Sequence, residues 1–343
     1  MVLVGAVFVA GPAGLLAKLT PESLDLSFWA TVVFVYYVLA TLLPIDKIIG
    51  KIYPIFAIAL IFMAAGILFM IFWHHPALPE LTDGIANTHP DGLPIFPMMF
   101  ISIACGAISG FHATQSPLMA RCMTNEKYGR PVFYGAMITE GIVALIWAAA
   151  ATYFFHTEEG SALFAAGSGN DNAAVIVDSI TKEWLGVVGG FLAILGVIAA
   201  PITSGDTAFR SARLIVADFL RVDQKPILKR LMISVPLFVA GYIILHANFS
   251  VLWRYFAWCN QTLAVFTLWA LTVYLTQKRK PYVITLIPAL FMTAVCSTYI
   301  LIAREGLHLP QELAYWLGGA VTLFIFVLFL VWRNKYLRRN PTI

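Results

Sequence analysis

The chain has 343 residues, of which 60% are hydrophobic and only 12% are charged. A globule of this size cannot hide so much apolar surface from water, so the composition excludes a water-soluble protein. The formal net charge of +4 is attributed below to membrane topology and gives no reason to expect a nucleic-acid partner. We therefore expect most of the chain to lie in a lipid bilayer.

Ten apolar runs reach or approach the ~20 residues that are needed to cross about 30 Å of hydrocarbon. In chain order they are Met1–Leu16, Phe28–Leu43, Ile52–Trp73, Phe96–Ala120, Val132–Phe155, Leu185–Ala200, Leu231–Leu245, Val251–Leu275, Tyr282–Ile302 and Leu313–Trp332. Backbone groups in lipid must satisfy each other, so each run is predicted to be helical. The predicted fold class is all-α: a polytopic transmembrane helix bundle with about ten spanning or interrupted helices, in a single transmembrane domain over residues 1–343.

Lys and Arg residues are concentrated in every second gap between these runs. Eighteen of the 22 lie in the gaps that follow the second, fourth, sixth and eighth runs and in the tail after the tenth run. Cytoplasmic loops carry an excess of Lys and Arg, so these gaps and the C-terminus are predicted to be cytoplasmic. Residues 205–230 form the longest such segment, a predicted basic loop or helix at the inner face of the cytoplasmic membrane.

The fourth run is a poor candidate for an unbroken spanning helix. Its sequence FISIACGAISGFHATQSPLMARC contains the potential helix breaks Gly106, Gly110 and Pro117. Around them lie the polar residues Ser109, His112, Thr114, Gln115 and Ser116. Glycine permits unwinding and proline frees a carbonyl group, so we predict a helix broken near Gly110–Pro117 whose polar groups bind the substrate. The alternative is an unbroken helix that packs closely on a neighbour through its glycines.

A second interruption is predicted after the sixth run, where Pro201 and Gly205 bracket the polar stretch ITS. Asp206 and Arg210 are four residues apart and would share one face of a helix, where their charges can neutralise each other. One interpretation makes Asp206 a coupling carboxylate and Arg210 part of a cytoplasmic gate. The other makes Ser-Gly-Asp the N-terminal cap of a helix over Asp206–Phe219.

Glu140 lies nine residues into the fifth run, with no basic residue within a helical turn. A carboxylate at such a depth costs at least ~2.5–3.5 kcal/mol unless it protonates, pairs or faces water. We predict that Glu140 carries a coupling proton; the alternative is a protonated side chain that only bonds a neighbouring carbonyl. Asn260 and Gln261 form a second buried polar pair, which could bind a substrate carboxylate or peptide group or instead bond between helices.

Motifs of soluble enzymes are absent from the sequence. There is no G-x-x-x-x-G-K-[ST], no H-E-x-x-H and no G-x-S-x-G, and the four cysteines form no C-x-x-C pair. We therefore predict no enzymatic activity, no metal and no cofactor. An intramembrane enzyme using Glu140 and His112 would have only their titratable side chains in its favour. A secondary carrier for a small molecule, coupled to H⁺ or Na⁺, is the remaining interpretation.

Four stretches resemble the carbon starvation protein A family in its shorter variety. They are LLPIDKIIGKIYPIF (Leu42–Phe56), FISIACGAISGFHATQSPLMARC (Phe100–Cys122), RPVFYGAMITEGIVALIWAAAA (Arg130–Ala151) and SGDTAFRSARLIVADF (Ser204–Phe219). The resemblance implies an inner-membrane carrier of peptides or pyruvate-like acids during nutrient limitation, driven by protons. It also implies the inverted repeats and discontinuous helices of the amino acid/polyamine/organocation carriers.

The sequence departs from that family at its start. Family members begin with further helices that carry a segment resembling H-H-F-x-S-I-A-G-A-G-P, which this sequence lacks. We therefore expect a chain that is truncated relative to the family and holds only part of the site. A competing hypothesis is a non-transporting membrane subunit or starvation sensor that signals through the basic segment Arg210–Arg230. The sequence does not define an oligomeric state.

Overall fold

The computed structural model describes residues 1–42, 46–75, 78, 87, 92–165, 173–246 and 249–340. Within these ranges all regular structure is helical, which confirms the predicted all-α class. The α-helices are α1 (Val2–Leu19), α2 (Leu26–Leu42), α3 (Asp46–His74), α4 (Ile95–Ala107), α5 (Phe111–Cys122), α6 (Ala136–Phe155), α7 (Glu158–Ala165), α9 (Ala173–Ala193), α10 (Ala199–Leu220), α11 (Ile227–Leu245), α12 (Phe249–Gln277), α13 (Val283–Ile302) and α14 (Gln311–Arg339). A short 3₁₀ helix, η1 (Glu126–Tyr128), and two π-helices, η2 (Arg130–Gly135) and η3 (Ile194–Ile198), complete the described elements.

Seven segments among the described residues are long and apolar enough to cross a membrane. They are Pro54–His74, Ile95–Cys122, Glu126–Phe155, Ile227–Leu245, Val251–Gln277, Val283–Ile302 and Gln311–Arg339. The first two predicted runs correspond to the shorter apolar stretches Val2–Ala17 and Leu26–Ala40. Many large apolar side chains on these helices are exposed, as expected where the surrounding solvent is lipid. The sixth predicted run is not a single α-helix, because it crosses an interruption in α9 and the π-helix η3.

The chain forms two compact units, each built from two separate parts of the sequence. The first unit comprises Met1–Pro79 and Ile138–Trp253, and the second comprises Glu80–Met137 and Arg254–Ile343. A single transmembrane domain over residues 1–343 stays a prediction.

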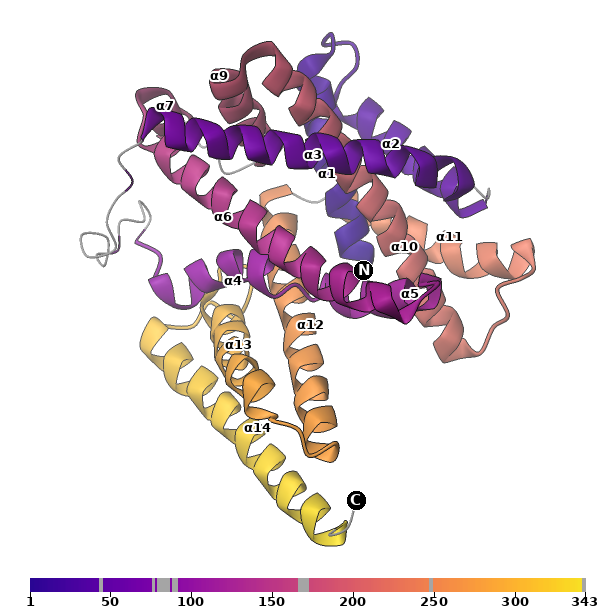
Figure 1. Ribbon diagram of the computed structural model, residues 1–343, viewed down its shortest axis with the longest axis vertical. Coiled ribbons are helices and arrows are strands. Elements are labelled where there is room, and N and C mark those ends of the chain that lie inside the picture. The colour runs from indigo at the N-terminus through magenta and orange to yellow at the C-terminus, as the bar shows by residue number, and fades with distance from the viewer. Residues whose placement is uncertain are drawn as a thin grey trace. The chain divides into compact units, whose positions relative to one another are not determined.

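Helix α10 is the central element of the first unit, where it packs against α1, α2 and α11 (Figure 1). The apolar cluster between these helices includes Tyr37 from α2, Phe209 from α10 and Phe238 from α11. A second apolar cluster joins α3, α6 and α9 through residues such as Met63, Phe154 and Trp184. Residues 205–220, predicted as the start of a cytoplasmic loop or helix, are part of α10, and eight residues between 205 and 217 are buried.

In the second unit, α14 and α4 pack against α13 (Figure 1), and α12 contacts α13 through hydrogen bonds and a shared apolar cluster. Its apolar cluster includes Ile101 from α4, Val265 from α12 and Met292 from α13. Three hydrogen bonds also join α12 to α13 at intervals along the two helices. The donors and acceptors are Trp258 Nε1 to the Cys296 carbonyl at 3.0 Å, Trp269 Nε1 to Thr293 Oγ1 at 3.0 Å, and Thr272 Oγ1 to Thr285 Oγ1 at 2.9 Å. These bonds hold α12 and α13 in one register.

Candidate functional site

The segment Ile95–Cys122 is interrupted between α4 and α5. Ile108 has an extended backbone (φ −142°, ψ 96°), and α5 begins at Phe111 with Gly110 as its N-cap residue. The interruption therefore lies at Ile108–Gly110, at the start of the predicted region. Gly106 lies inside α4, and Pro117 lies inside α5. The predictions of Gly106 and Pro117 as breaks are therefore wrong, because α4 continues past Gly106 and α5 continues past Pro117.

Gly110 brings the interruption into close contact with α12. A Cβ atom at this position would meet the carbonyl oxygen of Asn260 and would lie 2.7 Å from Leu263 Cβ and 2.8 Å from the Ala264 amide nitrogen. The φ of Gly110 is −65°, so its backbone would suit any residue. Glycine is required here by the close approach of two backbones.

Asn260 caps the first turn of α5. Its Oδ1 accepts a hydrogen bond from the Phe111 amide at 2.9 Å, and its Nδ2 donates to Ser109 Oγ at 3.0 Å and to Cys105 Sγ at 3.6 Å. The side chain of a helix-capping residue normally comes from the preceding few residues. Here the cap comes from a helix about 150 residues further along the chain.

Gln261 binds the backbone on the other side of the interruption. With its amide oriented so that each group meets a complementary partner, Nε2 donates to the Ile108 carbonyl at 2.7 Å and Oε1 accepts from the Cys105 amide at 3.0 Å. The residue is 0% exposed. Asn260 and Gln261 thus satisfy backbone groups at the break, which matches the alternative interpretation of bonding between helices.

The predicted substrate-binding side chains lie on or beside α5. Ser109, His112, Thr114 and Gln115 are half-buried, whereas Ser116 is exposed. His112 Nδ1 lies 3.2 Å from the Ser109 carbonyl. A carbonyl only accepts hydrogen bonds, so this contact requires the imidazole proton on Nδ1. Thr114 Oγ1 donates to the Phe111 carbonyl at 2.8 Å. The amides of His112 and Ala113 donate within the turn, at 3.2 and 3.1 Å to Ser109 and Gly110.

Asp206 and Arg210 form the ion pair that their spacing indicates, with Arg210 Nη2 3.0 Å from Asp206 Oδ2. The side chain of Asp206 is 5% exposed and that of Arg210 is 28% exposed. Nearby, the Tyr37 hydroxyl lies against Gly205 and donates to the carbonyls of Phe8 and Pro201, at 3.3 and 3.4 Å. Tyr37 was not singled out from the sequence, because nothing in an apolar helix marks one tyrosine as a partner for a glycine far along the chain.

The predicted kink at Pro201 and Gly205 is wrong. Both residues lie inside α10, which runs unbroken from Ala199 to Leu220. The departure from α-helical geometry lies before Pro201, in the π-helix Ile194–Ile198. A proline ring conflicts with the carbonyl four residues earlier, so the turn ahead of Pro201 is the one that changes. Helix α10 also starts before Ser204, so Ser-Gly-Asp is not its N-terminal cap.

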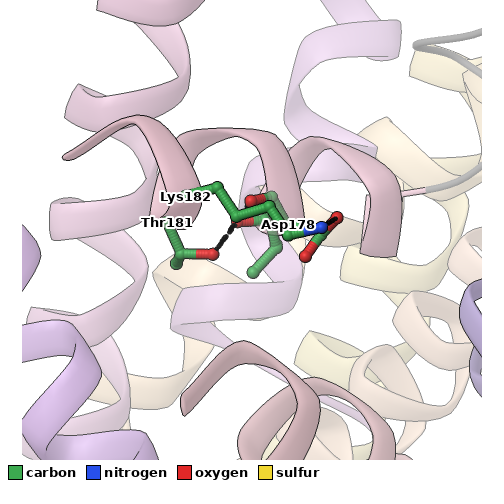
Figure 2. A network of polar contacts seen from close by, with 4 residues as sticks. Asp178, Thr181 and Lys182 are labelled. Atoms are coloured by element: carbon green, nitrogen blue, oxygen red, sulfur yellow. Dashed lines mark hydrogen bonds and ion pairs between the residues drawn. The ribbon is translucent and has the colours of Figure 1, made fainter. Parts of the chain in front are cut away.

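A second interruption, which the sequence reasoning missed, lies within α9 at Gly186, whose φ is 59° and ψ is −144°. Before it, Lys182 Nζ lies 2.7 Å from Asp178 Oδ2, and Thr181 Oγ1 donates to the Val177 carbonyl at 2.7 Å (Figure 2). After it, the chain passes so close to this turn that a Cβ at Gly189 would meet the Thr181 carbonyl. The glycine-rich stretch GVVGG was the available sequence signal.

Glu140 lies in α6, five residues after the π-helix η2. It is half-buried and belongs to the first unit, whereas Gly110 and its partners belong to the second. Its predicted role as the proton-coupling carboxylate stays a prediction. Within the described ranges, no group of three or more His, Cys, Asp or Glu side chains is arranged to hold a metal ion.

A family model described as carbon starvation protein CstA matches residues 1–184 and, in a second match, residues 149–299. The chain belongs to this family. Membership confirms the resemblance that the four sequence stretches indicated. With the seven candidate spans, it also establishes the chain as a multi-pass membrane protein.

Three relatives align with parts of the chain. An uncharacterized membrane protein of Haemophilus influenzae is 36% identical over 209 residues, which cover 46% of this chain and 56% of that protein. The peptide transporter CstA of Bacillus subtilis is 26% identical over 281 residues, covering 68% of this chain and 47% of that protein. The pyruvate/proton symporter BtsT of Escherichia coli is 41% identical over 78 residues, covering 22% and 11% respectively. The chain thus spans about half the length of the first two relatives. No solved structure matches it significantly.

Proposed function

We propose that this CstA family member is a secondary active transporter of the cytoplasmic membrane, which takes up small nutrients during carbon starvation. The observation that carries the proposal is the interruption at Ile108–Gly110 within a segment apolar enough to span the bilayer. An irregular backbone is tolerated at membrane depth only where protein or a polar passage surrounds it. The relatives named as a peptide transporter and a pyruvate/proton symporter support peptides or small carboxylic acids as the substrate class.

The first turn of α5 and its polar side chains form the proposed substrate-binding region. Asn260 and Gln261 hold the backbone of the break, and we therefore assign them to supporting the site. His112, Thr114 and Gln115 are half-buried on the same short helix. In this proposal, His112 Nε2 and the Gln115 amide contact the carboxylate or peptide group of the substrate.

Glu140 carries the coupling proton in this proposal. Its half-buried position in an apolar helix supports a carboxyl group that exchanges a proton as access alternates between the two sides of the membrane. In this proposal Asp206 and Arg210 form the cytoplasmic gate. Asp206 is buried and Arg210 is partly exposed, so separating the two side chains requires both charges to reach water.

Uptake into proteoliposomes tests the proposed function. The purified chain is reconstituted, and the uptake of labelled pyruvate and of a labelled dipeptide is measured with an inward proton gradient, with an inward sodium gradient and with neither. We expect accumulation of at least one substrate with the proton gradient only. Accumulation with the sodium gradient instead would show that Na⁺, and not H⁺, is the coupling ion. A folded, reconstituted protein that moves neither substrate under any gradient would favour the sensor hypothesis.

A further inference from the structure

A buried carboxylate outside the proposed site joins two helices of the second unit. Glu305, in the loop between α13 and α14, has a side chain that is only 5% exposed. Its Oε2 lies 3.2 Å from Arg254 Nε, and its Oε1 accepts a hydrogen bond from the Tyr299 hydroxyl at 2.6 Å. The Tyr255 hydroxyl donates to its backbone carbonyl. These four residues are called the Glu305 clamp below.

The carboxylate of Glu305 is paired at both oxygens, and its loop is held by backbone hydrogen bonds. Both oxygens of the carboxylate have partners, which a buried charge requires. The loop that carries Glu305 is held by the Gly306 amide, which donates to the Ala303 carbonyl at 2.9 Å, and by the Leu307 amide, which donates to Ile300 at 2.9 Å. Loss of the carboxylate would leave the Arg254 and Tyr299 groups without this partner, so α12 would lose its ion pair to the loop after α13 and keep the Tyr255 bond to the Glu305 backbone.

The clamp lies on the same face of α12 as Gln261. Arg254, Trp258 and Gln261 follow at intervals of four and three residues, so they line one face of the helix. Trp258 bonds α13 in the middle of this stretch. From Arg254 to Gln261 the helix rises only about 10 Å at ~1.5 Å per residue. A rotation of α12 at the clamp would therefore be transmitted to the amides at the break.

We propose that Glu305 is a positioning residue, which fixes the rotation of α12 and thereby keeps Asn260 and Gln261 bonded to the interrupted backbone at Ile108–Gly110. This role concerns the same site as the proposed function, and it rests on that function only where Glu305 is expected to affect uptake. The geometry of the break can be read independently of transport, because Cys105 lies at the break and its Sγ is 3.6 Å from Asn260 Nδ2.

Thiol labelling of Cys105 tests this role. The two exposed cysteines, Cys122 and Cys259, are replaced by Ala, and a Cys105→Ala version of the same protein gives the background from buried Cys296. The maleimide labelling rate is measured in detergent. We expect Glu305→Ala to raise the Cys105 rate about fivefold or more, because labelling follows the population of the locally opened state. Glu305→Gln, which keeps an acceptor for Tyr299, should give an intermediate rate.

Two comparisons separate positioning from a general loss of structure. Glu312→Ala removes an exposed carboxylate from the first turn of α14 and should leave the rate unchanged. In an Asn260→Ala protein, Cys105 should already label quickly, and adding Glu305→Ala should change the rate less than about twofold, because the two residues act through one contact. An unchanged rate in Glu305→Ala, or a full further rise on top of Asn260→Ala, would overturn the proposal.

Protein quality and transport are judged separately. If Glu305→Ala is not monodisperse by size exclusion, the same comparison is made with Glu305→Gln, and an unchanged rate there overturns the proposal. Failure of the unaltered chain to transport would count against the proposed function alone, since the labelling comparison does not depend on uptake.

Discussion

Asn260 is placed to act as a helix cap supplied from a distant part of the chain. Its Oδ1 binds the first amide of α5, and its Nδ2 binds Ser109 across the break. Capping side chains contribute about 0.5–2 kcal/mol, and hydrogen bonds between membrane helices contribute about 0.6 kcal/mol on average. Loss of this side chain is therefore expected to loosen the start of α5 and to lower the stability measurably.

Replacing this cap gives the first prediction. Asn260→Ala should lower the free energy of unfolding by about 1–2 kcal/mol, because one α5 amide and Ser109 lose their partner. Asn260→Asp keeps an acceptor for the Phe111 amide but loses the Nδ2 donor and buries an ionisable carboxyl group, so it should also be less stable than the unaltered protein. Thermal unfolding in detergent measures the difference. Equal melting temperatures for all three proteins would show that Asn260 does not hold the break.

The carboxyl group of Glu140 gives the second prediction. Glu140→Gln keeps the size and the hydrogen-bonding groups of the side chain but cannot exchange a proton. Proton-driven accumulation in proteoliposomes should fall to background, while exchange of labelled for unlabelled substrate without a gradient should continue. Glu158→Gln, an exposed residue in α7, is the control and should accumulate normally. Undiminished accumulation by Glu140→Gln would assign the proton to another residue.

At the scale of elements, the contact between the α4–α5 break and α12 depends on a single glycine. Gly110→Ala would place a methyl group against the backbone of Asn260 and within 2.8 Å of the Ala264 amide nitrogen. Overpacking of this kind costs about 1–3 kcal/mol, so we expect a lower melting temperature and faster labelling of Cys105. The matched control is Gly141→Ala in α6, where a Cβ meets nothing within 4 Å. A melting temperature for Gly110→Ala as high as that control would exclude the close approach.

The ion pair in α10 is also tested at this scale. Asp206→Asn should destabilise the first unit by about 1–3 kcal/mol, because Arg210 loses its charged partner and only part of its side chain reaches solvent. Asp206→Asn combined with Arg210→Gln should recover part of the stability, since no lone charge remains. If the pair is a gate, this double variant should still be impaired in proton-driven uptake. Recovery of both stability and uptake would reduce the pair to a structural contact.

At the scale of the whole molecule, the orientation in the membrane is the open prediction. Cys122 is exposed at the end of α5, next to Arg121, and the distribution of Lys and Arg predicts that it faces the cytoplasm. In a protein with Cys259→Ala, a membrane-impermeant maleimide should label Cys122 in inverted vesicles and not in intact cells. Glu158→Cys, introduced into a protein with both Cys122→Ala and Cys259→Ala, should show the opposite pattern. The reverse labelling pattern at both positions would show that the chain has the opposite orientation in the membrane.

The length and apolarity of the runs determined the fold class from the sequence alone. Hydrophobic length is a local property that lipid enforces on each segment separately, so the predicted runs could be recognised without knowing their partners. The same holds for the polar, glycine-containing character of Phe96–Ala120, which predicted an interruption in this segment. The spacing of Asp206 and Arg210 was likewise sufficient to predict their ion pair, because both lie on one helix.

Only the tertiary structure decided where the backbone is interrupted and what satisfies it. The break falls at Ile108–Gly110 because Asn260 and Gln261, far along the chain, supply hydrogen bonds to the freed backbone groups. At Pro201 the helix α10 continues, and the departure from α-helical geometry is the π-helical turn before it. A backbone group freed from a helix is tolerated only where another part of the fold supplies a hydrogen bond. Such a partner, far along the chain, cannot be recognised from a local sequence pattern.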